Sequence, residues 1–385
     1  MNTIRTTLAV AAALALAACA DQPSPVSAGP ARTAPLLSAA SGRAVAGEYV
    51  VVLHEGADPR AVAAVAGVRP QQVYQAALTG FAAPLSAGQL AALRHHPQVE
   101  YVEENQVVTA QAVQSPAPWG LDRIDQQFLP LNNAYVFNTL ASNVAAYIID
   151  TGILHTHPEF GGRASNVYDA FGGTGVDCNG HGTGVAGVVG AKTYGVAKGI
   201  KLLGVRVLNC SGSGTTAGII GGINWVAANH APLSVANISL GGAFSTALNT
   251  AVSNLFASGV FVAVPAGNGN APACNYSPAS VTAVTTVTAS DQADNHVPGS
   301  NFGSCVDLYA PGRNIPTVGL TTTPTLVTGT SIAAPHVAGA AALVFATFGG
   351  TASTVQSWIL TNATPGVIVG VPPGTPNTLL FKSSL

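Results

Sequence analysis

The amino-acid sequence predicts an α/β fold, in which a parallel β-sheet carries helices on both faces and a small α+β module precedes it. Three observations predict this: short continuous apolar runs, helical stretches between them, and a different order of elements near the N-terminus. The apolar runs lie after Pro116, at 144–149, 202–207, 235–239, 260–264 and 283–288. Alternating with helical stretches such as 217–228 and 246–257, they are typical of strands buried on both sides.

The preceding module covers residues 47–110. Strand-like segments are expected at 49–53, 73–77, 80–83 and 99–102. Asp58 and Pro59 predict the start of a first helix, because aspartate caps helix N-termini and proline is tolerated in the first turn. Ser86 and Gln89 have the spacing of a capping box for a second helix. The resulting order β-α-β-β-α-β is that of a ferredoxin-like module.

Composition and charge exclude several functions. Hydrophobic residues make up 48% of the chain and charged residues 8%, and the apolar excess comes with 43 glycines, as in compact proteins with many tight turns. Beyond the N-terminus no apolar run is expected to span a membrane. The net charge is −2 and no lysine or arginine cluster is present, so neither nucleic acid nor an anionic membrane surface is an expected partner.

Residues 1–20 have the pattern of a secretory signal, with Arg5 before an apolar core at 8–18. Cys19 allows two interpretations. The residues before it resemble a bacterial lipoprotein box, which would anchor the chain through a lipid on Cys19; ordinary cleavage after residue 20 is the alternative. Residues 21–46 are rich in proline, serine, alanine and glycine and are expected to form a flexible linker.

Export implies an oxidising compartment, which bears on the remaining cysteines. These are Cys178, Cys210, Cys274 and Cys305. Four cysteines are compatible with two disulfides in any of three pairings, and four buried thiols are the alternative.

Three residues stand in the local sequences that nucleophilic hydrolysis requires. Asp150 follows an apolar run directly, His181 lies in Asn-Gly-His-Gly-Thr-Gly, and Ser331 lies in Gly-Thr-Ser-Ile-Ala-Ala-Pro-His. A serine hydroxyl becomes a nucleophile when a base removes its proton, and a buried carboxylate fixes the tautomer of that base. Taken singly, each residue has a structural explanation: a strand-end turn, a turn histidine and a helix N-cap. Together, in the order Asp…His…Ser, they predict a catalytic triad.

A fourth residue fits the same chemistry. Asn268 lies in Ala-Gly-Asn-Gly after a buried strand, where an Asn-Gly turn is the structural alternative. Its amide can donate to a developing oxyanion beside the Ser331 N–H. That N–H is expected at the positive end of a helix over 332–345, with Pro335 in the first turn.

These motifs resemble the subtilisin-like serine proteases, specifically the proteinase K group that includes aqualysin. The resemblance runs from Gln114 to the C-terminus and includes Asp150-Thr151-Gly152, His181-Gly182-Thr183 and Gly329-Thr330-Ser331. Residues 47–110 resemble the family's propeptide, a chaperone and inhibitor, so 111–385 is the expected peptidase domain.

The resemblance implies an exported, monomeric endopeptidase that acts on proteins and peptides without a catalytic cofactor. Asp150 would orient His181, which would act as base toward Ser331. Substrate would add as a strand and its specificity would lean to apolar side chains. The implied substrate-binding residues are Gly212, Ser213, Gly214, Ser239, Leu240, Gly241, Ala266 and Gly267. The enzyme would be a zymogen that is cut near 109–112 and inhibited by its own propeptide.

The family also implies a disulfide pairing and a calcium site. Cys178 would pair with Cys210 and Cys274 with Cys305, each closing a loop of about thirty residues, which the loop-entropy treatment values at about 3–4 kcal/mol. Structural calcium would bind the Asp307 carboxylate with the main-chain oxygens of Thr282 and Val284. Asp307 as a surface turn carboxylate is the alternative.

Two positions depart from the pattern of the family. Gly184 stands where the family has histidine, which is expected to loosen the packing around His181. Ile332 replaces the usual methionine after the nucleophile, which predicts resistance to peroxide.

A catalytically dead, surface-anchored binding protein is a second hypothesis for the function, although all four catalytic positions are intact. An esterase or lipase is a third, although Ser331 lacks the Gly-x-Ser-x-Gly pattern.

Overall fold

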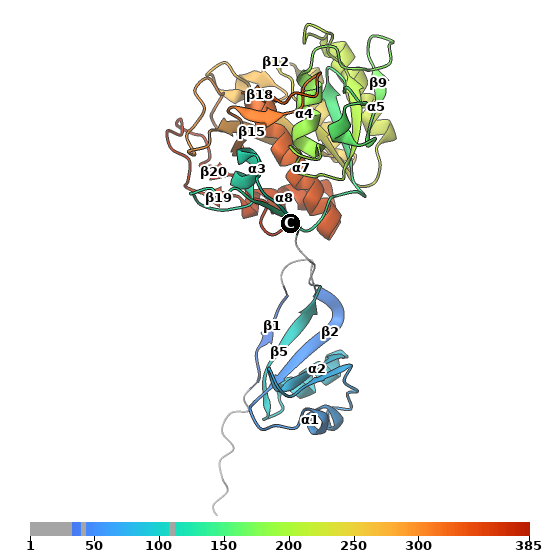
Figure 1. The fold of residues 1–385 in the computed structure, drawn as a ribbon, viewed down its shortest axis with the longest axis vertical. Helices are drawn as coiled ribbons and strands as arrows, with labels where there is room; N and C mark the ends of the chain where they lie inside the picture. Colours follow the sequence, from blue (N-terminus) through green and yellow to red (C-terminus); the bar gives the residue numbers. More distant parts are fainter. Residues whose placement is uncertain (1–32, 40–43, 108–111) are drawn as a thin grey trace, which may run out of the picture. The chain divides into compact units, whose positions relative to one another are not determined.

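The computed structural model describes residues 33–39, 44–107 and 112–385. The chain divides into two compact units, one up to Val107 and one from Val108 (Figure 1). The predicted signal sequence, Cys19 and most of the expected cleavage segment lie outside the described residues.

The N-terminal unit is a five-stranded sheet with two helices. Its elements are β1 (Leu36–Leu37), β2 (Ala44–Leu53), α1 (Pro59–Val65), β3 (Gln72–Tyr74), β4 (Gly80–Pro84), α2 (Ala87–Arg94) and β5 (Val99–Gln106). The strand order is β1-β5-β2-β4-β3, with β1 parallel to β5 and the other pairs antiparallel. Side chains from both helices and from the central strands form one core. The predicted ferredoxin-like order is confirmed for β2 to β5.

The predicted caps and the predicted linker have different outcomes. Asp58 accepts hydrogen bonds from the main chain of α1, and Ser86 and Gln89 form the capping box of α2. The prediction that the whole of 21–46 is a linker is wrong in its C-terminal part. There β1 and the first residues of β2 join the sheet, with Leu36 paired to Val102. Edge pairing of a two-residue strand has no periodic signal in the sequence.

The C-terminal unit contains a nine-stranded sheet with the order β19-β20-β16-β15-β13-β11-β8-β10-β9. All neighbouring strands are parallel except β19 and β20. The strands of this sheet are β8 (Ala145–Asp150), β9 (Ala164–Asp169), β10 (Lys201–Arg206), β11 (Ser234–Asn237), β13 (Phe261–Pro265), β15 (Thr285–Ser290), β16 (Leu308–Pro311), β19 (Thr364–Pro365) and β20 (Thr378–Leu379). Smaller pairs are β6 (Ala112–Gln114) with β7 (Tyr135–Phe137), β12 (Gly242–Ala243) with β14 (Tyr276–Ser277), and β17 (Ile315–Thr317) with β18 (Thr325–Val327).

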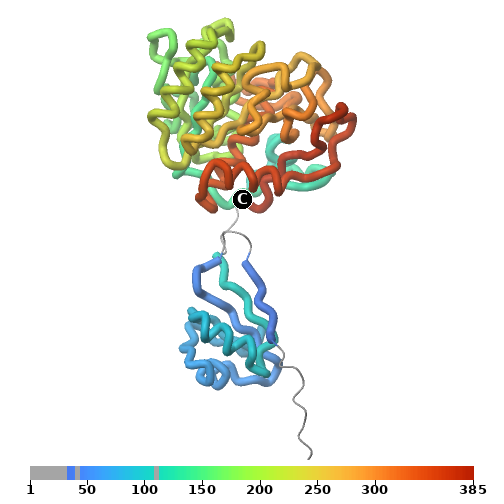
Figure 2. Tube along the Cα trace, turned by 180° about the vertical axis from the view of Figure 1, so that it is seen from behind, coloured from blue at the N-terminus to red at the C-terminus, as the bar shows by residue number. Residues whose placement is uncertain are grey.

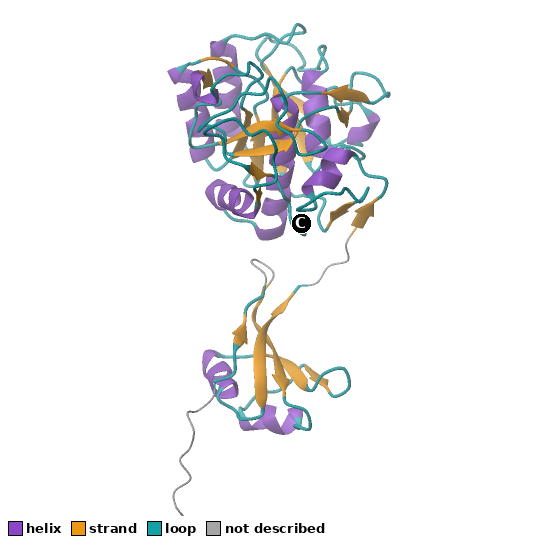
Figure 3. Cartoon of the chain, turned by 90° about the vertical axis from the view of Figure 1, so that its left-hand side faces the viewer, coloured by secondary structure: helices purple, strands orange, loops and turns teal. Residues whose placement is uncertain are grey.

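Helices cover both faces of this sheet (Figure 3). The helical elements are α3 (Trp119–Ile124), η1 (Pro158–Phe160), α4 (His181–Gly190), α5 (Thr216–Asn229), α6 (Thr246–Ala257), η2 (Ala273–Asn275), α7 (Thr330–Phe348) and α8 (Ala352–Asn362). Helices α4, α7 and α8 share one core, whereas α5 and α6 lie side by side over the other face (Figure 2). Strand β8 is buried on both sides, with Ile148 in the first core and Ile149 in the second. The predicted doubly covered parallel sheet is confirmed.

Helix α7 differs from the prediction at its start. It begins at Thr330 after the cap Gly329, whose φ of 148° suits glycine, so Ser331 lies inside the first turn and is not the N-cap. Pro335 is therefore the sixth helical residue, and its predicted place in the first turn is wrong.

The expectation that no run beyond the N-terminus is long and apolar enough for a membrane span is also wrong. Among the described residues, α7 passes that test by length and composition. It is 78% buried inside the protein, as expected of the central helix of a packed core.

Candidate active site

Asp150 and His181 meet at the carboxyl edge of the sheet. Asp150 is the last residue of β8 and is fully buried, and His181 is the first residue of α4. His181 Nδ1 lies 2.8 Å from Asp150 Oδ1 and 2.9 Å from Oδ2. The Thr151 N–H donates to Asp150 Oδ1 at 2.7 Å, and the Thr151 hydroxyl accepts from the Gly182 N–H at 2.9 Å. The carboxylate therefore holds the Nδ1–H of the imidazole and leaves Nε2 for chemistry.

The electrostatics of this pair favour a protonated histidine. The negative charge of Asp150 raises the pKa of His181 above its ordinary value, and the hydrogen bond that His181 donates to Asp150 and the charge of Asp177 act in the same direction. Burial of the ring opposes them, but the charge of Asp150 is the largest contribution. About 30% of the His181 side chain remains exposed, so the ring can reach a substrate in the cleft.

Asp177 is a second buried carboxylate, which the sequence did not single out. Its Oδ1 accepts from the N–H groups of Asn179 and Gly180 at 2.8 and 2.9 Å. Its Oδ2 accepts from the N–H and the hydroxyl of Thr183 at 2.9 and 2.6 Å. Gly180 has no side chain with which to cap α4, so Asp177 supplies the cap from outside the helix and fixes the loop that carries His181.

Ser331 lies across the cleft, in the first turn of α7. It lines a cavity of about 300 Å³ together with Ala266, Gly267 and Asn268. Within the described part of the chain, no hydrogen bond links the Ser331 hydroxyl to His181. Such contacts often shorten only when substrate is bound, so this geometry is compatible with a nucleophile and its base.

Asn268 is exposed to the cleft, but its side chain is oriented from behind. Its Oδ1 accepts from the Thr330 N–H at 2.9 Å and from the Thr330 hydroxyl at 3.1 Å. Because the oxygen is held in this way, the NH₂ group of Asn268 is left as the donor that faces the cleft. Thr330 was part of the predicted Gly-Thr-Ser motif, but the sequence indicated no role for it.

The loop that carries Asn268 is in turn held by Asn301, a residue that no local sequence signal marks. Asn301 is 1% exposed. Its Nδ2 donates to Ala266 O at 2.8 Å, and its Oδ1 accepts from the Gly269 and Ala271 N–H groups at 2.9 and 3.0 Å. Gly267 has a φ of 104°, and a Cβ there would lie 2.4 Å from Asn301 Nδ2, so only glycine fits this loop.

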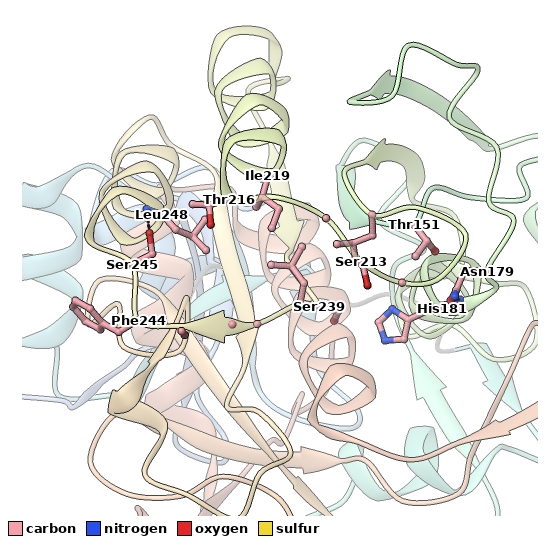
Figure 4. A pocket seen from close by; sticks show the side chains of 17 residues that line it. Thr151, Asn179, His181, Ser213, Thr216, Ile219, Ser239, Phe244, Ser245 and Leu248 are labelled. Atoms are coloured by element: carbon pink, nitrogen blue, oxygen red, sulfur yellow. Dashed lines mark hydrogen bonds between the residues drawn. The ribbon is translucent and has the colours of Figure 1, made fainter.

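The predicted substrate-binding residues line two adjoining cavities. A cavity of about 620 Å³ is bordered by Gly212, Ser213, Gly214, Ser239, Leu240 and Gly241 and includes His181 (Figure 4). Figure 4 places Ser213 near His181 and Phe244 at the far end. Leu240 and Gly241 also line the smaller cavity beside Ser331. The segments 212–214 and 240–241 lie outside the strands of the sheets. The Gly212 N–H and the Ser213 carbonyl already bond to Asn209 in a turn, so an added strand would use other main-chain groups of these segments.

The disulfides have the pairing that the resemblance implied. Cys178 is bonded to Cys210 and Cys274 to Cys305. The first bond joins the loop before His181 to the loop before Gly212, so it links the catalytic and substrate-binding sides of the larger cavity.

The surroundings of the Asp307 carboxyl bear on its predicted role as a calcium ligand. Burial raises the pKa of its carboxyl from 3.8 to about 6, although the Thr286 N–H donates to Oδ2 at 2.7 Å. Among the described residues there is no cluster of three or more His, Cys, Asp or Glu that could hold a metal. A calcium site built from one carboxylate and main-chain oxygens would not contain such a cluster. The Asp307 carboxylate is largely buried and, within the part of the chain that the structure describes, has no cationic side chain beside it, which suits a calcium ligand.

The two departures from the family pattern lie close to the site. Gly184 is buried, and a Cβ added there would lie 3.4 Å from Thr317 Cγ2 and 3.5 Å from Val318 O, which is ordinary contact. The Thr317 hydroxyl donates to Gly184 O at 2.8 Å, so β17 covers this position closely. Ile332 is 1% exposed directly after Ser331.

A parallel sheet with helices on both faces, a buried Asp–His pair and a helix-borne serine across the cleft together define a serine hydrolase. The comparisons with known proteins then identify its family. Residues 141–379 match the Subtilase family, and residues 48–111 match Peptidase inhibitor I9. The chain belongs to the subtilase family and is a serine endopeptidase with an N-terminal inhibitor domain, as predicted.

Relatives cover nearly the whole chain. An extracellular serine proteinase of Thermus sp. (strain Rt41A) is 46% identical over 96% of this chain and 96% of its own. Proteinase R of Parengyodontium album is 40% identical over 91% of this chain and 92% of its own. The crystal structure of a cold adapted subtilisin-like serine proteinase aligns with a TM-score of 0.68 at 48% identity, covering 70% of this chain and 99% of that one.

Proposed function

We propose that this chain is exported and hydrolyses peptide bonds through Ser331 as nucleophile, His181 as general base and acid, and Asp150 as the group that orients His181. The observation that carries this proposal is the contact of His181 Nδ1 with both oxygens of the fully buried Asp150, at 2.8 and 2.9 Å. That contact leaves Nε2 as the only ring nitrogen that can accept a proton from Ser331.

The reaction follows from these positions. His181 takes the hydroxyl proton as Ser331 Oγ attacks the carbonyl carbon of the substrate. The resulting oxyanion accepts hydrogen bonds from Asn268 Nδ2 and from the Ser331 N–H, which lies at the positive end of α7. Protonated His181 then gives its proton to the leaving amine. A water molecule releases the acyl group from Ser331 by the same steps.

The substrate class is proteins and peptides, and the specificity is broad with a preference for apolar side chains. A substrate strand lies between 212–214 and 239–241 and uses its main chain, which makes binding largely independent of sequence. Ala266 and Gly267 line the cavity next to Ser331, and their small size leaves room for an apolar side chain. The protein acts as a monomer, and its net charge of −2 does not favour a nucleic-acid partner.

The N-terminal unit serves as intramolecular inhibitor and folding chaperone and is removed by cleavage near 109–112. The match of residues 48–111 to a peptidase inhibitor family supports this zymogen arrangement. The extracellular Thermus relative supports export through the signal at residues 1–20. It does not support the alternative of a lipid anchor at Cys19.

Structural calcium binds Asp307 with the main-chain oxygens of Thr282 and Val284. Because the folded-state pKa of Asp307 is raised from 3.8 to about 6, ionisation of this carboxyl lowers stability as pH rises through that range, and a bound cation offsets the loss. Calcium should therefore raise the Tm of the wild type at pH 8 but not that of Asp307→Asn. An equal calcium effect on both proteins would exclude this site.

The function is tested with residues 21–385, made as wild type and as Ser331→Ala. The wild type is expected to lose a fragment that ends near 109–112 and to digest casein, as followed by intact mass and release of soluble peptides. The variant is expected to stay full length and inert. If both stay full length, folded and inactive, the catalytically dead binding protein becomes the better hypothesis.

A further inference from the structure

The first turn of α7 lacks one main-chain hydrogen bond, at the residue that carries the proposed nucleophile. In an α-helix the carbonyl of residue 331 accepts from the N–H of residue 335. Residue 335 is a proline inside the helix, so it has no N–H, and its ring pushes against the carbonyl four residues earlier. The carbonyl of Ser331 is therefore without its helical donor, on the residue that carries the nucleophilic hydroxyl.

A side chain from the segment just after β11 supplies the missing donor. The Ser239 hydroxyl donates to Ser331 O at 2.8 Å, and Asn237 Nδ2 donates to Ser239 Oγ at 2.6 Å. Ser239 is 2% exposed and Asn237 is fully buried. Each bond in such a chain polarises the next, and in a dry environment both are stronger than they would be in water.

These two hydrogen bonds connect the main chain of Ser331 to strand β11 in the middle of the sheet. Asn237 is the last residue of β11 and lies in register with Ile148 of β8, two residues before Asp150. Ser239 begins the segment that borders the substrate cavity. The backbone of Ser331, the proposed substrate strand and the Asp150 carboxylate are thus positioned from the same two neighbouring strands.

We propose that Asn237 and Ser239 are positioning residues for the nucleophile, because their hydrogen-bond relay replaces the helical bond that Pro335 removes from Ser331. The inference rests on the proposed function, in which Ser331 is the nucleophile. It predicts that loss of the relay acts on kcat more than on KM, since the main chain of 239–241 still binds substrate.

The test compares Ser239→Ala with Ser234→Ala in the full exported chain. Ser234 is the matched control because it is also fully buried, begins β11, and donates its hydroxyl to a main-chain carbonyl, Ala231 O, at 2.7 Å. Both variants lose one buried hydroxyl and should lose a similar amount of Tm. Only Ser239→Ala should lose kcat, by about 10- to 100-fold, the size of effect expected when a reacting atom is misplaced.

Restoring the helical donor gives a second readout. Pro335→Ala returns an N–H at residue 335, so the double variant Ser239→Ala with Pro335→Ala should recover part of the kcat that Ser239→Ala loses. The acid limb of the pH profile should stay where it is in the wild type, because the contact of Asp150 with His181 is untouched.

Four results decide between these possibilities. Equal kcat for Ser239→Ala and Ser234→Ala would overturn the relay, and so would the absence of any recovery in a double variant that is folded by circular dichroism. Ser331→Ala is measured beside them. If it is inert while Ser239→Ala keeps full activity, only the relay fails; if Ser331→Ala keeps activity, the proposed function itself fails.

Discussion

The two sides of the cleft are held in place by different chemistry. On the histidine side two buried carboxylates position the site: Asp150 holds the imidazole of His181, and Asp177 fixes the loop before His181. On the serine side neutral side chains position the site: Thr330 holds the amide of Asn268, and Asn301 holds the loop that carries Asn268.

The difference follows from what each side must do. The base has to change its charge during the reaction, and neighbouring carboxylates set the pH at which it does so. The oxyanion donors have to stay fixed and uncharged while negative charge develops next to them. A carboxylate there would repel the charge that the site is meant to stabilise. Substitutions on the two sides should therefore differ in pH dependence as well as in size.

The largest effect is expected for Asp150→Asn. The amide cannot stabilise a positively charged His181 and favours the wrong tautomer, so kcat should fall by about 10⁴-fold, the loss associated with this change in a catalytic triad. Steady-state hydrolysis of a peptide substrate measures it. Asp177→Asn in parallel should lose far less, and comparable losses in the two would contradict the distinct role of Asp150.

The next effect is expected for Asn268→Ala, on the neutral side. Loss of one oxyanion donor should lower kcat by about 10²- to 10³-fold, the range known for the equivalent asparagine of subtilisin, with little change in KM. The pH at which activity falls should not move. Asn268→Asp sharpens the test, since its activity should fall further as the new carboxyl ionises. A shifted acid limb in Asn268→Ala would refute the separation of the two sides.

A smaller effect, mainly in the pH dependence of activity, is expected for Asp177→Asn. The charge of Asp177 helps to raise the pKa of His181, so its removal should lower that pKa. Only neutral His181 acts as base, and activity falls as pH drops through this pKa. The acid limb of kcat/KM should therefore move to lower pH. Asp169→Asn is the control, because this carboxylate also accepts main-chain N–H groups, from Phe171 and Gly175, but makes no such contribution to His181. An equal shift in both variants would count against the specific effect of Asp177.

The smallest effect under ordinary conditions is expected for Ile332→Met. The chain has a single methionine, at position 1, so the serine side contains no thioether. The variant should match the wild type without peroxide and lose activity faster with it, since oxidation makes the buried side chain polar beside Ser331. Residual peptide hydrolysis after timed exposure to peroxide measures this, and equal inactivation rates would show that the isoleucine has no protective effect.

Several parts of the molecule were predictable because their signals are local. The continuous apolar runs predicted β8, β10, β11, β13 and β15, and the capping residues Asp58 and Ser86 predicted the starts of α1 and α2. Short strands such as β1 and β20 were not predicted, since their pairing depends on a neighbour distant in sequence.

The candidate site divides along the same line. By itself, the sequence determined which residues are proposed to carry the chemistry, because Asp150, His181, Ser331 and Asn268 each lie in a short stretch whose residue types serve one reaction. Only the tertiary structure decided what holds them in place. Asp177, Asn301 and Ser239 act through side-chain hydrogen bonds whose partners come together only when separate elements pack. The start of α7 belongs to the same class. The helix begins at Thr330 after the cap Gly329, so Pro335 lies inside it, and the Ser331 carbonyl accepts from Ser239 in the segment after β11.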